Sequence, residues 1–221
     1  MYLKRKADAY LNAWKSDPNR SPLIIKGPRQ VGKTETIDYF AAHNYRSVVE
    51  INFVEEPKYR AITADGYGAD TIVRNISLID PAKKFIPGDT LIFFDEIQAH
   101  PDIVTALKFF KIDGKYDVIC SGSMLGISYK QIESNSVGYK TDYEMRSLDF
   151  EEFLWARGYD EAVIESMFTH LCDATPFSEV EMNVFSTAFM DYCVLGGMPA
   201  VVASHIRTGT FEGTLQLQRQ L

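Results

Sequence analysis

Residues 27–34 read Gly27-Pro28-Arg29-Gln30-Val31-Gly32-Lys33-Thr34 and fit the pattern G-x-x-x-x-G-K-[ST]. The apolar run before them, residues 23–25, predicts a buried strand, and residues 33–43 after them predict a helix. A strand, a glycine-containing loop and a helix start are the context that this pattern requires. The stretch therefore predicts a phosphate-binding loop, the Walker A motif, and the rest of the chain is interpreted around it.

The spacing of this loop has a chemical reason. Its two glycines, Gly27 and Gly32, are expected to let the backbone curl with its N–H groups pointing inward around an anion. A helix that starts near Lys33 adds its positive dipole end and its unpaired N–H groups. Lys33 can reach the β- and γ-phosphates, and Thr34 offers its hydroxyl to Mg²⁺. Arg29 either contacts a phosphate or is an exposed loop charge, and the sequence leaves both interpretations open.

The composition is that of a globular protein with one sizeable α/β domain and a smaller appendage. Of 221 residues, 46% are hydrophobic and 24% are charged, and the net charge is −7. An acidic balance argues against a strongly basic nucleic-acid surface. No apolar run reaches about 18 residues, so we expect no membrane span. Three widely spaced cysteines form neither a zinc motif nor a disulfide framework, which indicates a cytoplasmic protein.

A second motif lies at the end of another predicted strand. Residues 90–96 form an almost continuous apolar run that ends in Asp95 and Glu96. An acidic residue at this position can hold Mg²⁺, and a glutamate next to it can act as a general base on the attacking water. Two acids in a strand-to-helix turn are common. Together with the upstream phosphate-binding loop, however, they indicate a Walker B motif, with Asp95 as metal ligand and Glu96 as catalytic base.

A third candidate element follows the predicted strand at residues 116–121. A polar residue at the end of such a strand can sense the γ-phosphate or position the water, and Ser121 and Ser123 are both candidates. The alternative for either serine is a plain turn after a strand.

The remaining pattern suggests the overall organisation. Strands alternate with helices up to residue 123, which predicts a mostly parallel sheet with helices on both faces. Beyond it, helices dominate, and Asp149 with Glu152 has the spacing of a capping box. A basic turn at residues 4–6 is interpreted as a solvated helix face in preference to a phosphate contact. Asp70 is expected to cap a helix that runs toward Ile79, and a further short helix is expected at residues 124–133.

Several motifs in this order resemble a known family. They are GPRQVGKT (27–34), LIFFDEIQ (91–98), SGSML (121–125), LDFEEFL (148–154) and GGMP (196–199). The series is similar to the prokaryotic AAA-like (AAA_14 type) P-loop ATPases that carry a DUF4143 C-terminal region, and it covers nearly the whole chain. The resemblance implies the 5-1-4-3-2 sheet of ASCE P-loop NTPases, followed by a small helical domain. It places the ATPase core at residues 1–172 and the start of the DUF4143-like part at residues 173–221. Family members usually continue further, so an N-terminal fragment or a shortened gene is expected.

One departure from the family pattern concerns a Gly-Arg pair before the LDFEEFL segment. Here Gly138 is followed by Tyr139 and Lys140. The role of that arginine would fall to Lys140 or Arg146, or be absent. A lysine would supply a point charge without the arginine fork.

The leading functional hypothesis is an ATPase that binds ATP and Mg²⁺ and hydrolyses ATP to ADP and phosphate. Adenine is implied by the resemblance, as is coupling to a protein or nucleic-acid partner, while ring-forming relatives make a homo-oligomer a further candidate partner. The alternative is an ATP-binding interaction module with little or no hydrolysis. A small-molecule kinase is disfavoured, because phosphotransfer needs no water-activating glutamate and no arginine-rich lid follows Ser123.

Overall fold

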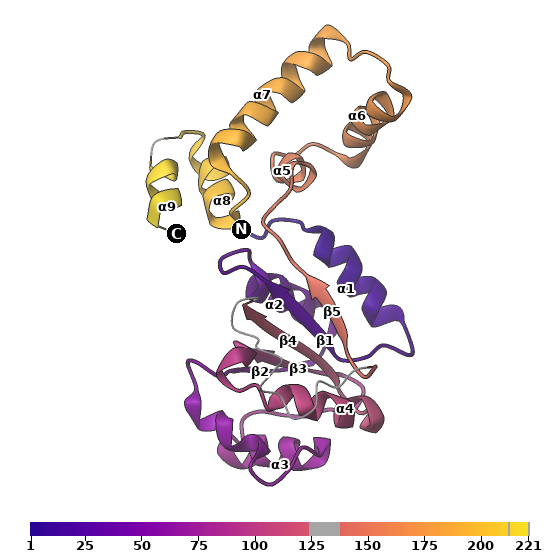
Figure 1. Cartoon of the computed structure of the whole chain (residues 1–221), viewed down its shortest axis with the longest axis vertical. Helices are drawn as coiled ribbons and strands as arrows, with labels where there is room; N and C mark the ends of the chain where they lie inside the picture. Colours follow the sequence, from indigo (N-terminus) through magenta and orange to yellow (C-terminus); the bar gives the residue numbers. More distant parts are fainter. Residues whose placement is uncertain (124–137, 212, 221) are drawn as a thin grey trace. The chain divides into compact units, whose positions relative to one another are not determined.

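The computed structural model describes residues 1–123, 138–211 and 213–220 (Figure 1). Its centre is a five-stranded parallel sheet with the strand order β2-β3-β4-β1-β5. The strands are β1 (Leu23–Gly27), β2 (Ser47–Asn52), β3 (Thr90–Asp95), β4 (Asp117–Ser123) and β5 (Thr141–Glu144). Read from β5, this is the expected 5-1-4-3-2 order, so the predicted fold class is confirmed. The helix expected at residues 124–133 and the end of the SGSML motif lie outside the described residues.

The middle strands are buried because their sequences are apolar on both faces. Every residue of β3 is buried, and Phe93 and Phe94 point to opposite faces of the sheet. Asp95, at the last position of this strand, is the charged exception. A buried carboxylate at the end of an apolar strand requires polar partners nearby. Polar side chains are therefore expected to gather at this edge of the sheet.

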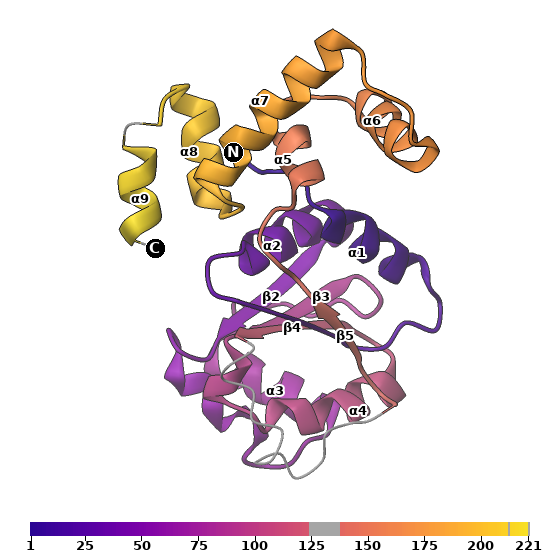
Figure 2. The same ribbon diagram turned by 45° about the horizontal axis from the view of Figure 1, so that its top comes forward.

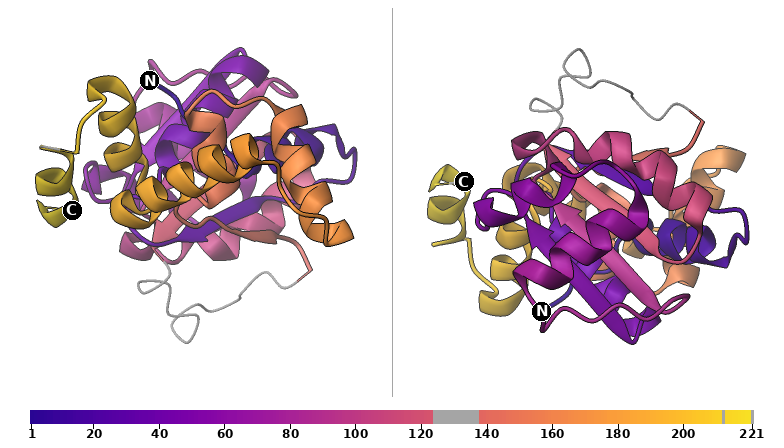
Figure 3. Two further views of the ribbon diagram at one scale, coloured as in Figure 1. Left: turned by 90° about the horizontal axis from the view of Figure 1, so that it is seen from above. Right: turned by 90° about the horizontal axis from the view of Figure 1, so that it is seen from below.

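Helices cover both faces of the sheet (Figure 2). On one face lie α1 (Lys6–Ser16) and α2 (Lys33–Asn44), whose rings Trp14 and Phe40 meet with centroids 6.3 Å apart. On the other face lie α3 (Ala69–Ile79) and α4 (Ile103–Asp113), which come to the front when the molecule is seen from below (Figure 3). Short 3₁₀ turns, η1 (Pro57–Thr63) and η2 (Ile97–Ala99), follow β2 and β3.

The chain divides into two compact units. The sheet unit comprises residues 10–29 and 33–145, and the helical unit comprises residues 1–9, 30–32 and 146–221. The helices of the second unit are α5 (Phe150–Ala156), α6 (Glu161–Asp173), α7 (Glu179–Leu195), α8 (Pro199–Thr208) and α9 (Thr214–Gln220). Within the helical unit, Leu154 of α5 and Ile164 of α6 share a core with Phe185 of α7. The domain boundary expected near residue 172 stays a prediction.

Two of the quoted motifs meet inside the helical unit. The predicted capping box is confirmed, since Asp149 accepts from the backbone N–H of Glu152, whose carboxylate accepts from the N–H of Asp149. Just before it, the Leu148 N–H donates to the carbonyl of Gly197 at 2.8 Å. A Cβ atom at Gly197 would lie 2.1 Å from the Leu148 carbonyl oxygen, so only glycine permits this approach.

Within the described residues, no helix combines the length and the apolar character needed to cross a membrane.

Candidate functional site

The carboxyl ends of the central strands bring the predicted residues to one edge of the sheet unit. Gly27, the last residue of β1, is paired with Ser123 of β4, and Asp95, the last residue of β3, is paired with Asn52 of β2. Because all of these strands are parallel, the residues that follow them emerge on the same side. The phosphate-loop sequence, the acidic pair and the two serines thus lie at the ends of three adjacent strands.

The phosphate loop has the alternating backbone expected of an anion nest, with Gly32 left-handed as expected and Gln30 in place of Gly27 as the second left-handed residue. Left-handed φ values occur at Gln30 (65°) and Gly32 (87°). Gly27 is instead the last residue of β1. One left-handed position is therefore taken by a non-glycine residue, which costs about 1 kcal/mol or more of conformational strain. Strain held in a loop of this shape is typical of ligand-binding sites.

Lys33 begins α2 and folds back over the loop. Its ammonium donates to the carbonyl of Gly27 at 3.0 Å and to that of Pro28 at 2.7 Å. Partial burial lowers the pKa of Lys33, and the carboxylates of Glu96 and Asp95 act in the opposite direction. The ammonium therefore lies at the loop that precedes it and is close enough to both acids for their charges to affect it.

Asp95 is 4% exposed and is held by four donors. Thr34 Oγ1 donates to Oδ2 at 3.1 Å, and Asn52 Nδ2 donates to the same oxygen at 3.4 Å. The Glu96 N–H donates to Oδ1 at 2.8 Å, and the Ser121 hydroxyl donates to that oxygen as well. Asn52 is a neighbour that the sequence analysis missed. Its position at the end of a strand adjacent to β3 was the available signal.

The oxygens of Thr34 and Asp95 fit a magnesium ion that is bound together with a nucleotide. Over the described ranges, no group of three or more His, Cys, Asp or Glu side chains forms a metal site by itself. Mg²⁺ that accompanies a nucleotide needs only one or two protein oxygens, since phosphates and water complete its shell. A hydroxyl and a carboxylate 3.1 Å apart at the phosphate loop supply that number.

Glu96 has a strained backbone and a side chain held by a neighbour. It adopts φ 53° and ψ 46°, in the left-handed region that non-glycine residues rarely occupy. The Gln98 side-chain amide donates to one of its carboxylate oxygens. The other end of that amide, Gln98 Oε1, is buried and has no hydrogen-bond partner within the part of the chain that the structure describes. Gln98 was quoted in the LIFFDEIQ motif but was not among the predicted site residues.

The two serines of β4 differ in their surroundings. Ser121 is buried and its hydroxyl is engaged by Asp95. Ser123 is half-buried at the end of the strand, opposite the first residue of the phosphate loop. The structure thus separates two candidates that the sequence could not distinguish.

The basic residues discussed for the site lie in different places. Arg29 is exposed, and its charge contributes to lowering the pKa of Lys33. Lys140 forms an ion pair with Asp142 at 2.8 Å. It precedes Thr141, which is paired with Leu23 at the start of β1. Lys140 therefore lies at the amino end of the strands, at the opposite end of the sheet from the phosphate loop.

Comparison with known proteins agrees with this geometry. No curated protein matches the sequence. Among solved structures, "Structure of C. elegans PCH-2" is similar with a TM-score of 0.43 and 10% identity, over 80% of this chain. This chain spans half the length of that protein, and a similarity at this level carries no further argument. The sequence model described as AAA domain matches residues 19–154, which include the phosphate loop and the acidic pair. Because that match spans more than half of the chain, this protein belongs to the AAA domain family of P-loop ATPases.

Proposed function

We propose that this chain is a magnesium-dependent ATPase that hydrolyses ATP to ADP and phosphate and couples its nucleotide state to a protein or nucleic-acid partner. The observation that carries the proposal is the hydrogen bond between Thr34 and Asp95, because it joins the two halves of a nucleotide site that are far apart in the sequence. Either motif alone would be weak evidence. Their contact at the carboxyl edge of a parallel sheet supports one composite site.

Binding is assigned to the loop and to the start of α2. The amides of residues 30–34 and the helix dipole attract the phosphates, and the Lys33 ammonium exchanges its carbonyl partners for phosphate oxygens. Thr34 and Asp95 would hold Mg²⁺, which supplies neutralisation of the phosphate charge when it is bound. Asn52 and Ser121 orient the Asp95 carboxylate through their hydrogen bonds.

Turnover is assigned to Glu96, which would take a proton from the attacking water. Gln98 restrains that carboxylate with its amide N–H. Its carbonyl oxygen, which has no partner among the residues that the structure describes, would accept a hydrogen bond from the same water. Ser123 is assigned to the γ-phosphate in preference to Ser121, because the hydroxyl of Ser121 is already donated to Asp95.

One observation favours the alternative, an ATP-binding module that barely hydrolyses. Tyr139 stands where relatives are expected to have a positively charged arginine, and the neighbouring Lys140 is paired with Asp142. A site without that charge stabilises the transition state less well. Such a site would bind ATP but hydrolyse it slowly.

Two substitutions separate binding from turnover. In Lys33→Ala, we expect ATP affinity to fall by about 100-fold or more, because the phosphates lose a charge-assisted hydrogen bond. In Glu96→Gln, we expect ATP affinity to change by less than about threefold and turnover to fall by about 10²–10⁴-fold. Glu165→Gln, which changes an exposed residue of α6, is the matched control and should behave like the parent protein. Calorimetry with MgATP and a phosphate-release assay measure the two properties.

Each outcome of this experiment has a separate meaning. A parent protein that binds no MgATP would refute the proposed function. A parent that binds MgATP but shows no turnover, with or without DNA, RNA or cell extract, would establish the interaction module instead. Turnover by Glu96→Gln at the parent rate would remove Glu96 from the role of base.

A further inference from the structure

Arg5 is a buried arginine that the sequence analysis misplaced in a solvated basic turn. It is 4% exposed, and its guanidinium donates to three acceptors in two other segments of the helical unit. Nε donates to Glu152 Oε1 at 3.1 Å, Nη1 to the carbonyl of Val31 at 2.7 Å, and Nη2 to the carbonyl of Arg146 at 2.6 Å. A buried guanidinium that donates to these three acceptors holds them in a fixed arrangement.

The contact with Val31 bears directly on the phosphate loop. Val31 lies between the two left-handed residues of the loop, Gln30 and Gly32. In a trans peptide the carbonyl of one residue and the N–H of the next point in opposite directions. A guanidinium that fixes the Val31 carbonyl therefore also fixes the Gly32 N–H, which must point away from Arg5. Gly32 N–H is one of the amides that a phosphate nest uses.

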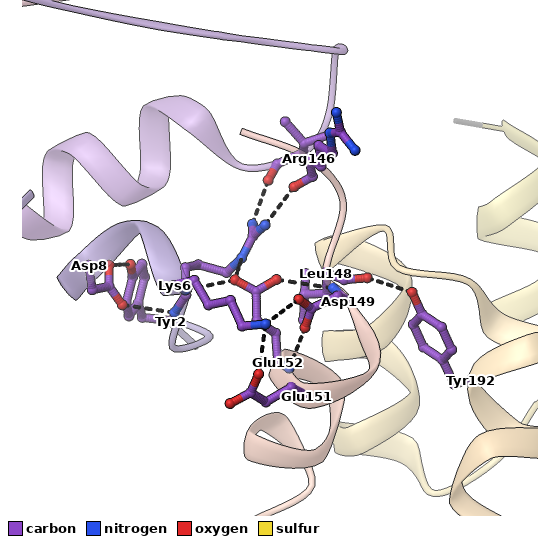
Figure 4. A network of polar contacts seen from close by, with 11 residues as sticks. Tyr2, Lys6, Asp8, Arg146, Leu148, Asp149, Glu151, Glu152 and Tyr192 are labelled. Carbon is purple, nitrogen blue, oxygen red and sulfur yellow. Dashed lines mark hydrogen bonds and ion pairs between the residues drawn. The ribbon is translucent and has the colours of Figure 1, made fainter. Parts of the chain in front are cut away.

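Through its Nε atom, the Arg5 guanidinium also contacts the start of α5. Glu152 is 4% exposed and belongs to the capping box of that helix. Its Oε1 also accepts from the Lys6 N–H at 2.7 Å, and its Oε2 accepts from the Asp149 N–H at 3.1 Å. Figure 4 shows Glu152 between the Lys6 and Asp149 contacts, with Arg146 nearby. Displacement of Arg5 would thus disturb the cap that begins α5.

Within the helical unit, a second neighbour of the loop residue Gly32 is independent of Arg5. A Cβ atom placed on Gly32 would lie 3.5 Å from Cγ of Pro199, the last residue of the GGMP motif and the first of α8. The peptide that Arg5 holds therefore also lies against a helix start that is separate from α5.

We infer that Arg5 is a positioning residue for nucleotide binding, which holds the Val31–Gly32 peptide in its phosphate-binding orientation and links phosphate occupancy to the order of α5. The inference rests on the proposed ATP binding. Because binding and helix order share one guanidinium, a phosphate that tightens the loop must also stabilise the α5 cap, and the linkage is reciprocal. Arginine is required, since a planar fork reaches three acceptors and an ammonium does not.

The first test is Arg5→Lys, which keeps the positive charge and loses the fork. We expect its affinity for MgADP to fall by about tenfold, and the slowing of hydrogen exchange in α5 that MgADP causes in the parent to disappear even at saturating MgADP. Arg207→Lys, at an exposed arginine of α8 in the same unit, is the matched control and should retain both properties. Saturation matters because a merely structural role for Arg5 would leave the response of α5 to bound nucleotide intact.

A second variant separates the two ends of the guanidinium. Glu152→Gln removes the carboxylate but leaves the bond from Arg5 to the Val31 carbonyl. We expect MgADP affinity within about threefold of the parent and loss of the α5 response. If a single variant fails to fold, the double variant Arg5→Met with Glu152→Gln avoids an unpaired buried charge and should show both losses.

The results distinguish this inference from the proposed function. If the parent binds MgADP and the Arg5→Lys or double variant binds it equally well with the same α5 response, the inference is overturned and the ATPase proposal stands. If the parent binds no MgADP, both are overturned. Loss of affinity with a retained α5 response would refute the linkage and leave only the positioning of the loop.

Discussion

The Asp95 carboxylate is well organised within the sheet unit, because both of its oxygens accept hydrogen bonds. Oδ1 accepts from the Glu96 N–H and from the Ser121 hydroxyl, and Oδ2 accepts from Thr34 and Asn52. Such preorganisation would reduce the conformational freedom that binding of the proposed Mg²⁺ must remove. It also changes the role expected of one serine, since a hydroxyl donated to Asp95 cannot at the same time be donated to a phosphate.

The two serines of β4 should therefore respond differently to truncation. In Ser121→Ala, we expect about 1–2 kcal/mol lower unfolding free energy, because a buried acceptor loses a donor, and a severalfold weaker magnesium dependence of ATP binding. In Ser123→Ala, we expect unchanged stability and about tenfold lower turnover at saturating ATP. Urea unfolding and a magnesium titration of ATP binding measure these effects. Ser77→Ala, which removes a hydroxyl bonded within α3, controls for the loss of a hydroxyl, and equal behaviour of both site variants would contradict the assignment.

At the scale of elements, the helical unit depends on one close backbone approach. The segment that leads into α5 and the segment between α7 and α8 touch through Leu148 and Gly197. Tyr192 of α7 adds a hydroxyl bond of 2.8 Å to the Leu148 carbonyl, as Figure 4 shows. Two motifs that are far apart in the sequence therefore form one joint, and the side-chain-free position at residue 197 is what lets them meet.

Gly197→Ala should break this joint. The new Cβ atom would lie 2.1 Å from a backbone oxygen, so the two segments must separate and the Leu148–Gly197 bond is weakened. We expect at least about 2 kcal/mol of lost stability in the helical unit, measured by thermal unfolding and by faster hydrogen exchange in α5 and α8. Gly68→Ala is the control, because its Cβ atom would make only an ordinary 3.5 Å contact with Thr71. Parent-like stability of Gly197→Ala would show that the joint is dispensable.

For the molecule as a whole, sequence patterns predicted the sheet, and they placed the candidate site at the carboxyl edge of that sheet, because both follow from local rules. Apolar strands and a glycine-containing loop can be recognised from the local sequence. Parallel pairing of the strands then places Asp95 near Thr34. The burial of Arg5 was not predictable, since it depends on acceptors at Val31 and Glu152 that only tertiary packing brings together.

Two smaller errors have similar physical causes. Asp70 fits a cap by composition, but α3 begins one residue earlier, after Gly68, and Asp70 lies in its first turn instead. The left-handed residue within the phosphate loop is Gln30 in addition to Gly32, although glycine is the residue that pattern rules associate with that conformation. In both places the surrounding structure selected the local backbone and overrode residue preference.

The acid stability of the protein should depend on His100. This side chain is buried in the sheet unit, with Nε2 3.0 Å from Thr63 Oγ1 and its ring 4.9 Å from that of Phe53. Burial lowers its pKa, with Asp102 opposing this effect and Arg60 reinforcing it. The unfolded state therefore binds a proton more readily than the folded state. The stabilisation is complete above the unfolded pKa of about 6.5 and is lost as the pH falls from there toward the folded pKa.

The comparison of parent and His100→Gln isolates this contribution. The variant keeps a polar group for Thr63 and loses ring packing, so we expect it to be less stable at pH 7.5 by about 1–2 kcal/mol. Between pH 7.5 and 5.5 the parent should lose more unfolding free energy than the variant, measured by urea unfolding at constant ionic strength. Raised pKa values of Asp38 and Glu50, caused first by partial burial, shift stability the opposite way but equally in both proteins. Parallel pH profiles for the two proteins would mean that His100 is protonated as easily in the folded chain as in the unfolded one.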